Sequence, residues 1–255
     1  MIKLYFPEID LKDTFECGQC FRWDNSGNSW CAVVEGEYVE VHKKDGYLII
    51  NSTKTEQFWK EYFDYDYKFD ANAATKFAKA AGGIRILKQN PWETLVSFII
   101  SQNNNIPRIK GIISRLCENF GDPIKSQYAF PTPQQLIGQD LAPLRAGFRD
   151  KYILSAAEKC NSTFLEDIAK LTTNELRVEL MKIKGVGKKI ADCVMLFAYH
   201  RLEVFPQDVW IIRIMKEQFG IESNEIDDFA QANFGSNAGY IQQYLYHYFR
   251  NKARR

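Results

Sequence analysis

A lysine, an aspartate and a pair of glycines carry the clearest chemistry in this sequence. Gly185 and Gly187 flank a single valine, and Lys189 follows two residues later. Glycines at such a turn let the backbone bend tightly and leave N–H groups open at a helix start, which suits a DNA phosphate. In the first turn of a helix, the helix dipole and the neighbouring Lys188 disfavour the ammonium form of Lys189. Because an amine attacks only when it is unprotonated, this position suits a nucleophile.

The segments on either side of the two glycines have helical periodicity. Apolar residues recur at helical spacing before the turn at Leu176, Leu180 and Ile183, and after it at Ile190, Val194 and Phe197. The pattern predicts a helix-hairpin-helix over residues 174–200. Taken alone, the same residues are better explained by a tight turn between two helices and a solvated surface lysine.

The stretch after the second helix supplies a carboxylate. Pro206 interrupts the chain, and Asp208 has the position of an N-cap for a helix that runs to Gly220. The negative charge of a capping aspartate can stabilise an oxocarbenium-like sugar or orient a lysine. An aspartate in this position is nevertheless more often a structural cap than a catalyst.

The elements that must position these residues change character along the chain. Residues 28–51 alternate β-branched and aromatic runs with Glu-Gly and Asp-Gly turns, which is typical of an antiparallel meander. Residues 55–69 and 72–83 have helical patterns, and from Pro91 the chain is almost entirely helical. Later helices are expected to end at Gly121, Gly185 and Gly220.

The predicted fold class is α+β and mainly α. An N-terminal antiparallel sheet with helices, residues 1–82, packs on a helical bundle, residues 83–255. The bundle contains the helix-hairpin-helix (174–200) and the Pro-x-Asp loop (206–208). Because there is no internal repeat and no low-complexity linker, the two parts are expected to form one compact unit.

Composition limits the class of protein. The chain has 255 residues, 45% of them hydrophobic, and no stretch approaches the ~20 apolar residues of a membrane span. The N-terminus lacks the pattern of a signal peptide, so a soluble intracellular protein is expected, cytoplasmic with the nucleoid if the source is bacterial. The formal net charge of +1 excludes a uniformly basic surface. Any charge that binds nucleic acid must therefore be local.

The cysteines do not form a disulfide framework. Six of them are scattered through apolar sequence, which favours reduced thiols. Cys17 and Cys20 have the spacing of a zinc or redox half-site, but no second Cys/His pair accompanies them. Two incidental cysteines beside a turn are the favoured interpretation.

The hairpin, Lys189 and the Pro206-x-Asp208 loop together resemble the helix-hairpin-helix, Gly/Pro-Asp superfamily of DNA glycosylases. The lysine is similar to that of its bifunctional branch. The resemblance implies that the amine displaces a damaged base, forms a Schiff base with C1′ of the sugar and permits β-elimination at the 3′ phosphate. It also implies that the aspartate is required alongside the lysine.

Three further segments resemble the 8-oxoguanine DNA glycosylases in particular. Residues 18–23 (GQCFRW) resemble the turn in which a glycine carbonyl, here that of Gly18, accepts the N7 hydrogen that 8-oxoguanine has and guanine lacks. In residues 82–121, Asn103 corresponds to the residue that fills the gap left by the flipped nucleotide. Arg108 corresponds to the residue that reads the cytosine left behind. Flipping is needed because the glycosidic bond is out of reach inside a stacked duplex.

The third segment, residues 235–246, resembles the C-terminal helix of that family. It implies that Gln242 bonds the Watson-Crick edge of the flipped base and that Tyr246 stacks on one face. Cys193, one helical turn after Lys189, would then cover the other face. The structural alternatives are a bend for 18–23, an exposed asparagine turn, an aromatic-rich core helix and a small buried thiol.

Some positions depart from the family pattern. Phe148 stands where a tyrosine wedge is common, and Arg149 follows it; both are expected to contact DNA. Trp210 replaces a histidine that contacts phosphate, so that contact is not transferred. The resemblance covers most of residues 15–250.

The resemblance implies no required cofactor. The family hairpin can hold a monovalent or divalent cation through backbone carbonyls, which here would be those of Met181, Ile183 and Val186. No iron-sulfur cluster is expected, because no cysteine follows Cys193. The expected partner of a monomeric protein is double-stranded DNA containing 8-oxoguanine, with no membrane.

Two other functions stay open at this point. A monofunctional alkylated-base glycosylase shares the sheet, the bundle and the aspartate but lacks the lysine. A hairpin module that binds DNA without chemistry has no use for Asp208 or for a base-stacking Tyr246.

Overall fold

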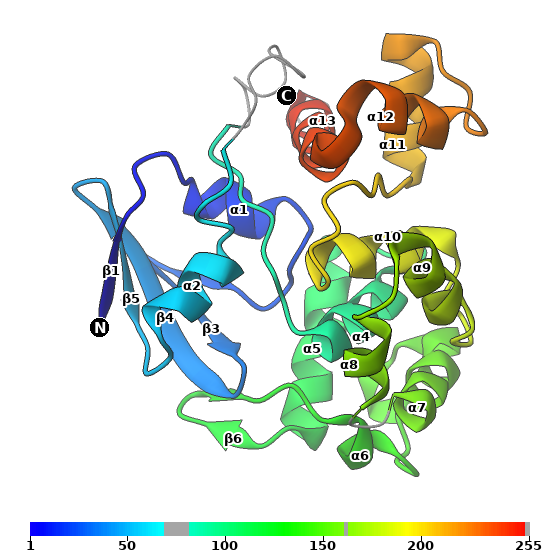
Figure 1. Ribbon diagram of the computed structural model, residues 1–255. Helices are drawn as coiled ribbons and strands as arrows, with labels where there is room; N and C mark the ends of the chain where they lie inside the picture. Colours follow the sequence, from blue (N-terminus) through cyan, green and yellow to red (C-terminus); the bar gives the residue numbers. More distant parts are fainter. Residues whose placement is uncertain (69–81, 161–162, 253–255) are drawn as a thin grey trace.

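The computed structural model describes residues 1–68, 82–160 and 163–252. Its N-terminal part is a five-stranded antiparallel sheet in the order β1-β5-β4-β3-β2 (Figure 1). The strands are β1 (Ile2–Tyr5), β2 (Asp24–Ser26), β3 (Ser29–Val34), β4 (Glu37–Lys44) and β5 (Tyr47–Asn51). The predicted meander over 28–51 is confirmed as β3, β4 and β5. β1 and β2 were not predicted, because each is short and joins an outer edge of the meander.

Alternating residues of the sheet build a small core of their own. Val39 and Val41 of β4 and Leu48 of β5 are fully buried on one face, as a period of two requires. The helices α1 (Leu11–Glu16) and α2 (Glu56–Tyr62) cover this face. The helix predicted over 55–69 ends at Tyr62, where the chain turns. The helix predicted over 72–83 falls almost entirely on residues 69–81, outside the described residues.

The remainder of the chain is a helical bundle, as predicted. Its helices are α4 (Pro91–Ser101), α5 (Ile106–Phe120), α6 (Pro133–Leu136), α7 (Asp150–Lys159), α8 (Phe164–Ile168), α9 (Thr173–Met181), α10 (Lys188–Phe197), α11 (Val209–Ile214), α12 (Ile226–Phe234) and α13 (Ala238–Lys252). A two-stranded hairpin, β6 (Pro123–Ile124) and β7 (Gln127–Tyr128), follows α5. Across the described residues, no helix has the length and apolar character needed to cross a bilayer.

The predicted helix ends are mostly confirmed. Pro91 occupies the first turn of α4, and α5 ends at its C-cap Gly121. α11 continues as a π-helical turn that ends at Gly220. The helix predicted to run to Gly185 ends earlier, at Met181, because a separate turn leads into the glycines.

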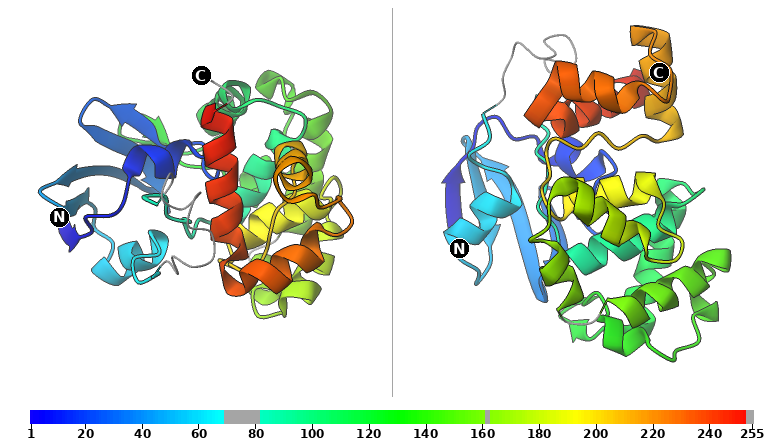
Figure 2. Two further views of the ribbon diagram at one scale, coloured as in Figure 1. Left: turned by 90° about the horizontal axis from the view of Figure 1, so that it is seen from above. Right: turned by 45° about the vertical axis from the view of Figure 1, so that its right-hand side comes forward.

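The last helix joins the two parts of the molecule. Figure 2 shows α13 (red) lying between the sheet on one side and the bundle on the other. Its residue Tyr240 donates from its hydroxyl to Asp64, at 2.7 Å, and accepts from the N–H of Ile86. His247 lies 3.3 Å from the carboxylate of Asp13, and this contact lowers the pKa of that carboxylate. α13 is therefore packed against both parts.

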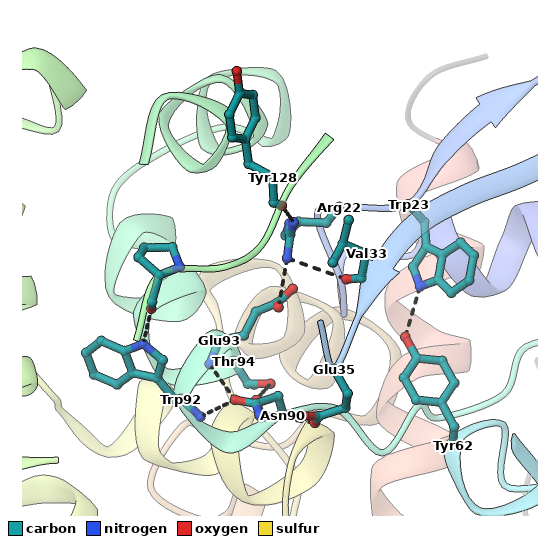
Figure 3. Close-up of polar contacts among 11 residues, drawn as sticks. Arg22, Trp23, Val33, Glu35, Tyr62, Asn90, Trp92, Glu93, Thr94 and Tyr128 are labelled. Carbon is teal, nitrogen blue, oxygen red and sulfur yellow. Dashed lines mark hydrogen bonds and ion pairs between the residues drawn. The ribbon is translucent and has the colours of Figure 1, made fainter. Parts of the chain in front are cut away.

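A largely buried arginine, Arg22, makes a second connection (Figure 3). Arg22 donates to Glu93 of α4 at 3.1 Å, to the carbonyl of Val33 in β3 and to the carbonyl of Tyr128 in β7. Burial raises the pKa of Glu93, and the charge of Arg22 opposes that rise. Asn90 caps the same helix by accepting from two backbone N–H groups of its first turn. Arg22 thus holds the sheet, α4 and the β6–β7 hairpin together.

The bridge by Arg22 predicts a large effect of its loss. In Arg22→Met the carboxylate of Glu93 stays largely buried without its cation, so the free energy of unfolding should fall by about 2–3 kcal/mol in urea titrations. Lys170→Met, which removes an exposed ion pair with Asp167, is the control and should leave stability nearly unchanged. Equal effects of the two substitutions would contradict the bridging role.

Candidate active site

A narrow pocket opens into a wide groove where α4, α10 and α13 meet the turn after α1. The pocket encloses about 130 Å³ and the groove about 960 Å³. Six residues line both: Ser101, Asn104, Ile106, Lys189, Asp208 and Tyr246. The predicted nucleophile and the predicted carboxylate therefore stand together at the junction between the two hollows.

Lys189 occupies the first turn of α10, as predicted, with Gly187 as the N-cap. Its half-buried side chain places Nζ 5.2 Å from the centre of the Phe98 ring. Within the described part of the chain, no carboxylate oxygen lies within 4.0 Å of this nitrogen. An aromatic wall and no anionic partner are the surroundings in which an amine can be presented to an electrophile.

Lys188 differs sharply from its neighbour. It lies 3.2 Å from Asp192 and 3.0 Å from Asp227. These carboxylates balance its charge, which weakens the predicted electrostatic effect of Lys188 on Lys189. Asp192 is itself buried and also accepts from Arg177 of α9 at 2.6 Å. Asp192 therefore clamps the two helices of the hairpin, and Lys188 belongs to that clamp.

Asp208 is the N-cap of α11, as predicted. Its Oδ1 accepts from the N–H of Ile211 at 2.8 Å, which fixes the side chain at the pocket mouth. Burial raises the pKa of the Cys193 thiol to about 11; the charge of Lys189 opposes this rise and that of Asp208 adds to it. The charges of Lys189 and Asp208 therefore both affect the thiol of Cys193.

The four residues predicted to hold a damaged base all line the pocket: Gly18, Cys193, Gln242 and Tyr246. Gly18 has a φ of +88°, and a Cβ there would lie 3.6 Å from the Tyr246 ring. Gln242 is buried, and its Oε1 has no hydrogen-bond partner among the described residues. A buried acceptor without a partner costs free energy, so this atom is prepared for a donor that enters the pocket.

A residue without a predicted role fixes the Gly18 turn. The side-chain amide of Gln19 is buried and donates to the carbonyls of Thr14 at 2.8 Å and Arg85 at 2.7 Å. Its Oε1 accepts from the N–H of Leu87 at 2.9 Å. The sequence predicts no separate role for Gln19, because its partners Arg85 and Leu87 lie far along the chain and leave no local signal. Phe98, which forms the wall beside Lys189, was missed for the same reason.

The asparagine turn faces the groove. Asn103 is exposed and has a φ of +49°, a left-handed conformation that glycine favours and that asparagine adopts more readily than most other residues. Arg149 donates from its guanidinium to the carbonyls of Gln102 and Asn103 and to that of Ala146. Arg149 therefore holds the asparagine turn in place.

This arrangement changes the task expected of Arg149. The residue is 3% exposed and its guanidinium donates to backbone carbonyls, so the structure does not offer it to DNA. Burial, and after it the charge of Arg108, lowers the pKa of its guanidinium. Phe148, by contrast, is 48% exposed and lines the groove, and Arg108 is exposed at the start of α5.

The two hairpin glycines have different surroundings. Gly185 has a φ of +86°, and a Cβ there would lie 2.4 Å from the ring of Tyr152. Gly187 is exposed at the groove, with nothing within 4 Å of the same position. Among the three carbonyls predicted to hold a cation, that of Ile183 accepts from the N–H of Val186. The described residues contain no cluster of His, Cys, Asp and Glu able to hold a metal ion.

Family models match nearly the whole chain. Residues 1–95 match the N-terminal domain of 8-oxoguanine DNA glycosylase, and residues 96–234 match the HhH-GPD superfamily of base excision DNA repair proteins. An N-glycosylase/DNA lyase of Saccharomyces cerevisiae is 40% identical over 86% of this chain and 70% of its own length.

Solved structures give the same result. The structure of MBOgg1 with a low affinity DNA ligand has a TM-score of 0.90 at 40% identity, over 97% of this chain and 94% of that one. The Clostridium acetobutylicum 8-oxoguanine glycosylase/lyase, with dsDNA containing cytosine opposite to 8-oxoG, has a TM-score of 0.88 at 36% identity, over 97% and 93%.

The surroundings of the two glycines predict unequal effects of adding a methyl group. Gly185→Ala combines a strained φ with a collision against Tyr152, so the free energy of unfolding should fall by about 2 kcal/mol or more. Gly187→Ala is the matched control and should cost much less. Urea unfolding of both proteins measures the difference, and a larger loss in Gly187→Ala would refute this account of the hairpin.

Proposed function

We propose that this protein removes 8-oxoguanine opposite cytosine. The chain belongs to the HhH-GPD superfamily of base excision DNA repair proteins and has the N-terminal domain of the 8-oxoguanine DNA glycosylases, so it is a DNA glycosylase/lyase. The observation that carries the proposal is the junction of pocket and groove. Lys189 and Asp208 stand there together, where the sugar of a nucleotide flipped from the groove into the pocket would lie.

The lesion is read by the pocket walls. The carbonyl of Gly18 accepts the N7 hydrogen of 8-oxoguanine, and the unpartnered Oε1 of Gln242 accepts an N–H from the Watson-Crick edge. Tyr246 stacks on one face of the base and the buried thiol of Cys193 covers the other. The Watson-Crick donors are the same in guanine, so Gln242 binds the edge that the two bases share. The carbonyl of Gly18 selects against guanine, because guanine has no hydrogen on N7 and leaves that acceptor without a partner.

The chemistry needs only side chains of this protein. The unprotonated amine of Lys189 attacks C1′ while the bond from C1′ to the base nitrogen breaks and the base leaves with the electron pair. The negative charge of Asp208 stabilises the positive charge that develops on the sugar. The attached nitrogen loses a proton, the bond from C1′ to the ring oxygen breaks, and that oxygen takes up a proton and stays on C4′ as a hydroxyl, which gives the Schiff base. Water then accepts a proton from C2′, a double bond forms between C2′ and C3′, and the bond from C3′ to the phosphate oxygen breaks, so the 3′ phosphate leaves with its electron pair.

The DNA is held around this centre by groove residues. Asn103 fills the gap left by the flipped nucleotide, Phe148 separates the neighbouring bases, and Arg108 reads the opposite cytosine. The open N–H at Gly187 binds a backbone phosphate. Arg149 and Gly185 support this surface from behind, through the asparagine turn and the Tyr152 contact.

Three further parts of the proposal concern the whole molecule. A cation at the carbonyls of Met181, Ile183 and Val186 would stiffen the hairpin without taking part in the chemistry. The protein acts as a monomer in the compartment that holds the DNA. The chain divides at 82/83 into a sheet domain and a helical glycosylase domain.

Borohydride trapping tests the nucleophile. Incubation with a duplex carrying 8-oxoguanine opposite cytosine, followed by borohydride, should give a covalent adduct with wild-type protein and none with Lys189→Gln. Lys188→Gln is the neighbouring control and should still be trapped, although it loses contacts with Asp192 and Asp227. An adduct that persists in Lys189→Gln would overturn the assignment.

Asparagine at position 208 separates the cap from the charge. Asn caps a helix as well as Asp, so Asp208→Asn should keep the stability of the wild type, whereas Asp208→Ala should lose about 1 kcal/mol. Single-turnover base excision should fall by about 100-fold or more in both. Near-normal excision in Asp208→Asn would mean that the carboxylate serves only as a cap.

A further inference from the structure

One arginine at the groove has no role in the mechanism above. Arg250 lies one helical turn after Tyr246 on α13 and lines the groove together with Lys189 and Asp208. The carbon at the centre of its guanidinium is 5.7 Å from the centre of the Tyr246 ring. Its Nη1 donates to the carbonyl of Glu16, at the end of α1, at 3.3 Å. These two contacts fix the guanidinium beside the mouth of the pocket.

The few charged residues that line the groove make the position of Arg250 important for binding an anion. Its charged lining residues are Lys189, Asp208 and Arg250. Lys189 gives up its proton to attack, and Asp208 is negative, so the chemistry leaves the groove with one lasting cation. A guanidinium keeps its charge throughout and carries five N–H donors in a planar fork. Among the described residues, the guanidinium of Arg250 makes one hydrogen bond, to the carbonyl of Glu16, which leaves donors for a ligand.

We propose that Arg250 binds a non-bridging phosphate oxygen of the damaged strand next to the flipped nucleotide. The proposal rests on the function proposed above, because a flipped nucleotide must bring its own phosphates to the mouth of the pocket. The same guanidinium lies over the ring of Tyr246 and so also helps to hold the ring that covers the base. Phosphate binding and base stacking are thereby coupled through one side chain.

The test is the salt dependence of binding. The ligand is a duplex with a tetrahydrofuran abasic analogue opposite cytosine, which the enzyme cannot cleave, and binding is measured by fluorescence anisotropy between 50 and 200 mM KCl. Loss of one phosphate contact should reduce the slope of log K against log salt by about 0.9 and weaken binding about fivefold at 150 mM. We expect this change in Arg250→Gln. Arg250→Lys should restore the slope, because it restores the charge.

Arg213→Gln is the matched control. Arg213 is an exposed arginine of α11 that is paired with Glu217 and does not line the groove, so its loss should leave the slope unchanged. If Arg250→Gln weakened binding without changing the slope, the side chain would only hold Tyr246 and the phosphate contact would be refuted. That result would leave the proposed function intact, as long as wild type still bound the duplex and gave its borohydride adduct. Failure of wild type in both assays would overturn both proposals.

Discussion

The hydrogen bonds of the buried Gln19 side chain are the interaction on which the rest of the site depends. Its amide joins the turn after α1 to residues 85–87, in the extended segment that leads into α4. Gly18 precedes it, and Arg22 follows it with the link to Glu93. The turn therefore stands as a rigid wall between the sheet and the bundle. Without that wall, the pocket would lack one side and α13 would lose part of the surface against which it packs.

The side chains of the candidate active site are positioned by the N-terminal ends of helices. Lys189 lies in the first turn of α10, Asp208 caps α11, and the asparagine turn precedes α5. Helix N-termini leave backbone N–H groups without partners, and the side chains of Asp208 and Asn105 are fixed by accepting from such groups. The bundle core behind them is closely packed, with Phe98 stacked on Phe197 at 5.5 Å. The catalytic side chains therefore lie at helix ends on the edge of a closely packed core.

Much of this could be predicted from the sequence, because its strongest signals are local. The meander, the hairpin, the Asp208 cap and the start of α4 follow from turn residues and periodicity within short windows. The edge strands β1 and β2 lack such a window, since each depends on a partner strand. The resemblance to a family supplied the pocket residues, which periodicity alone could not have brought together.

The parts that could not be predicted depend on contacts between distant residues. Arg149 was expected at the DNA because it follows the exposed Phe148, but its guanidinium lies beneath the asparagine turn. Lys188 was expected to act on its neighbour, but Asp227 from α12 balances its charge together with Asp192. Arg250 gave no signal at all. In each case the role of the side chain depends on its burial or on a partner from a distant part of the chain.

The Gly18 turn has a consequence for how such an enzyme can change its substrate over evolution. In the proposed reading of the lesion, the discriminating atom is a main-chain oxygen, which every amino acid possesses. Point mutation cannot exchange that oxygen for another group, and the φ of +88° disfavours any side chain in its place. New lesion preferences must therefore arise at Gln242 and Tyr246, or through residues such as Gln19 that set the direction of the carbonyl. Inherited specificity is in this way protected at one wall of the pocket and open to variation at the other.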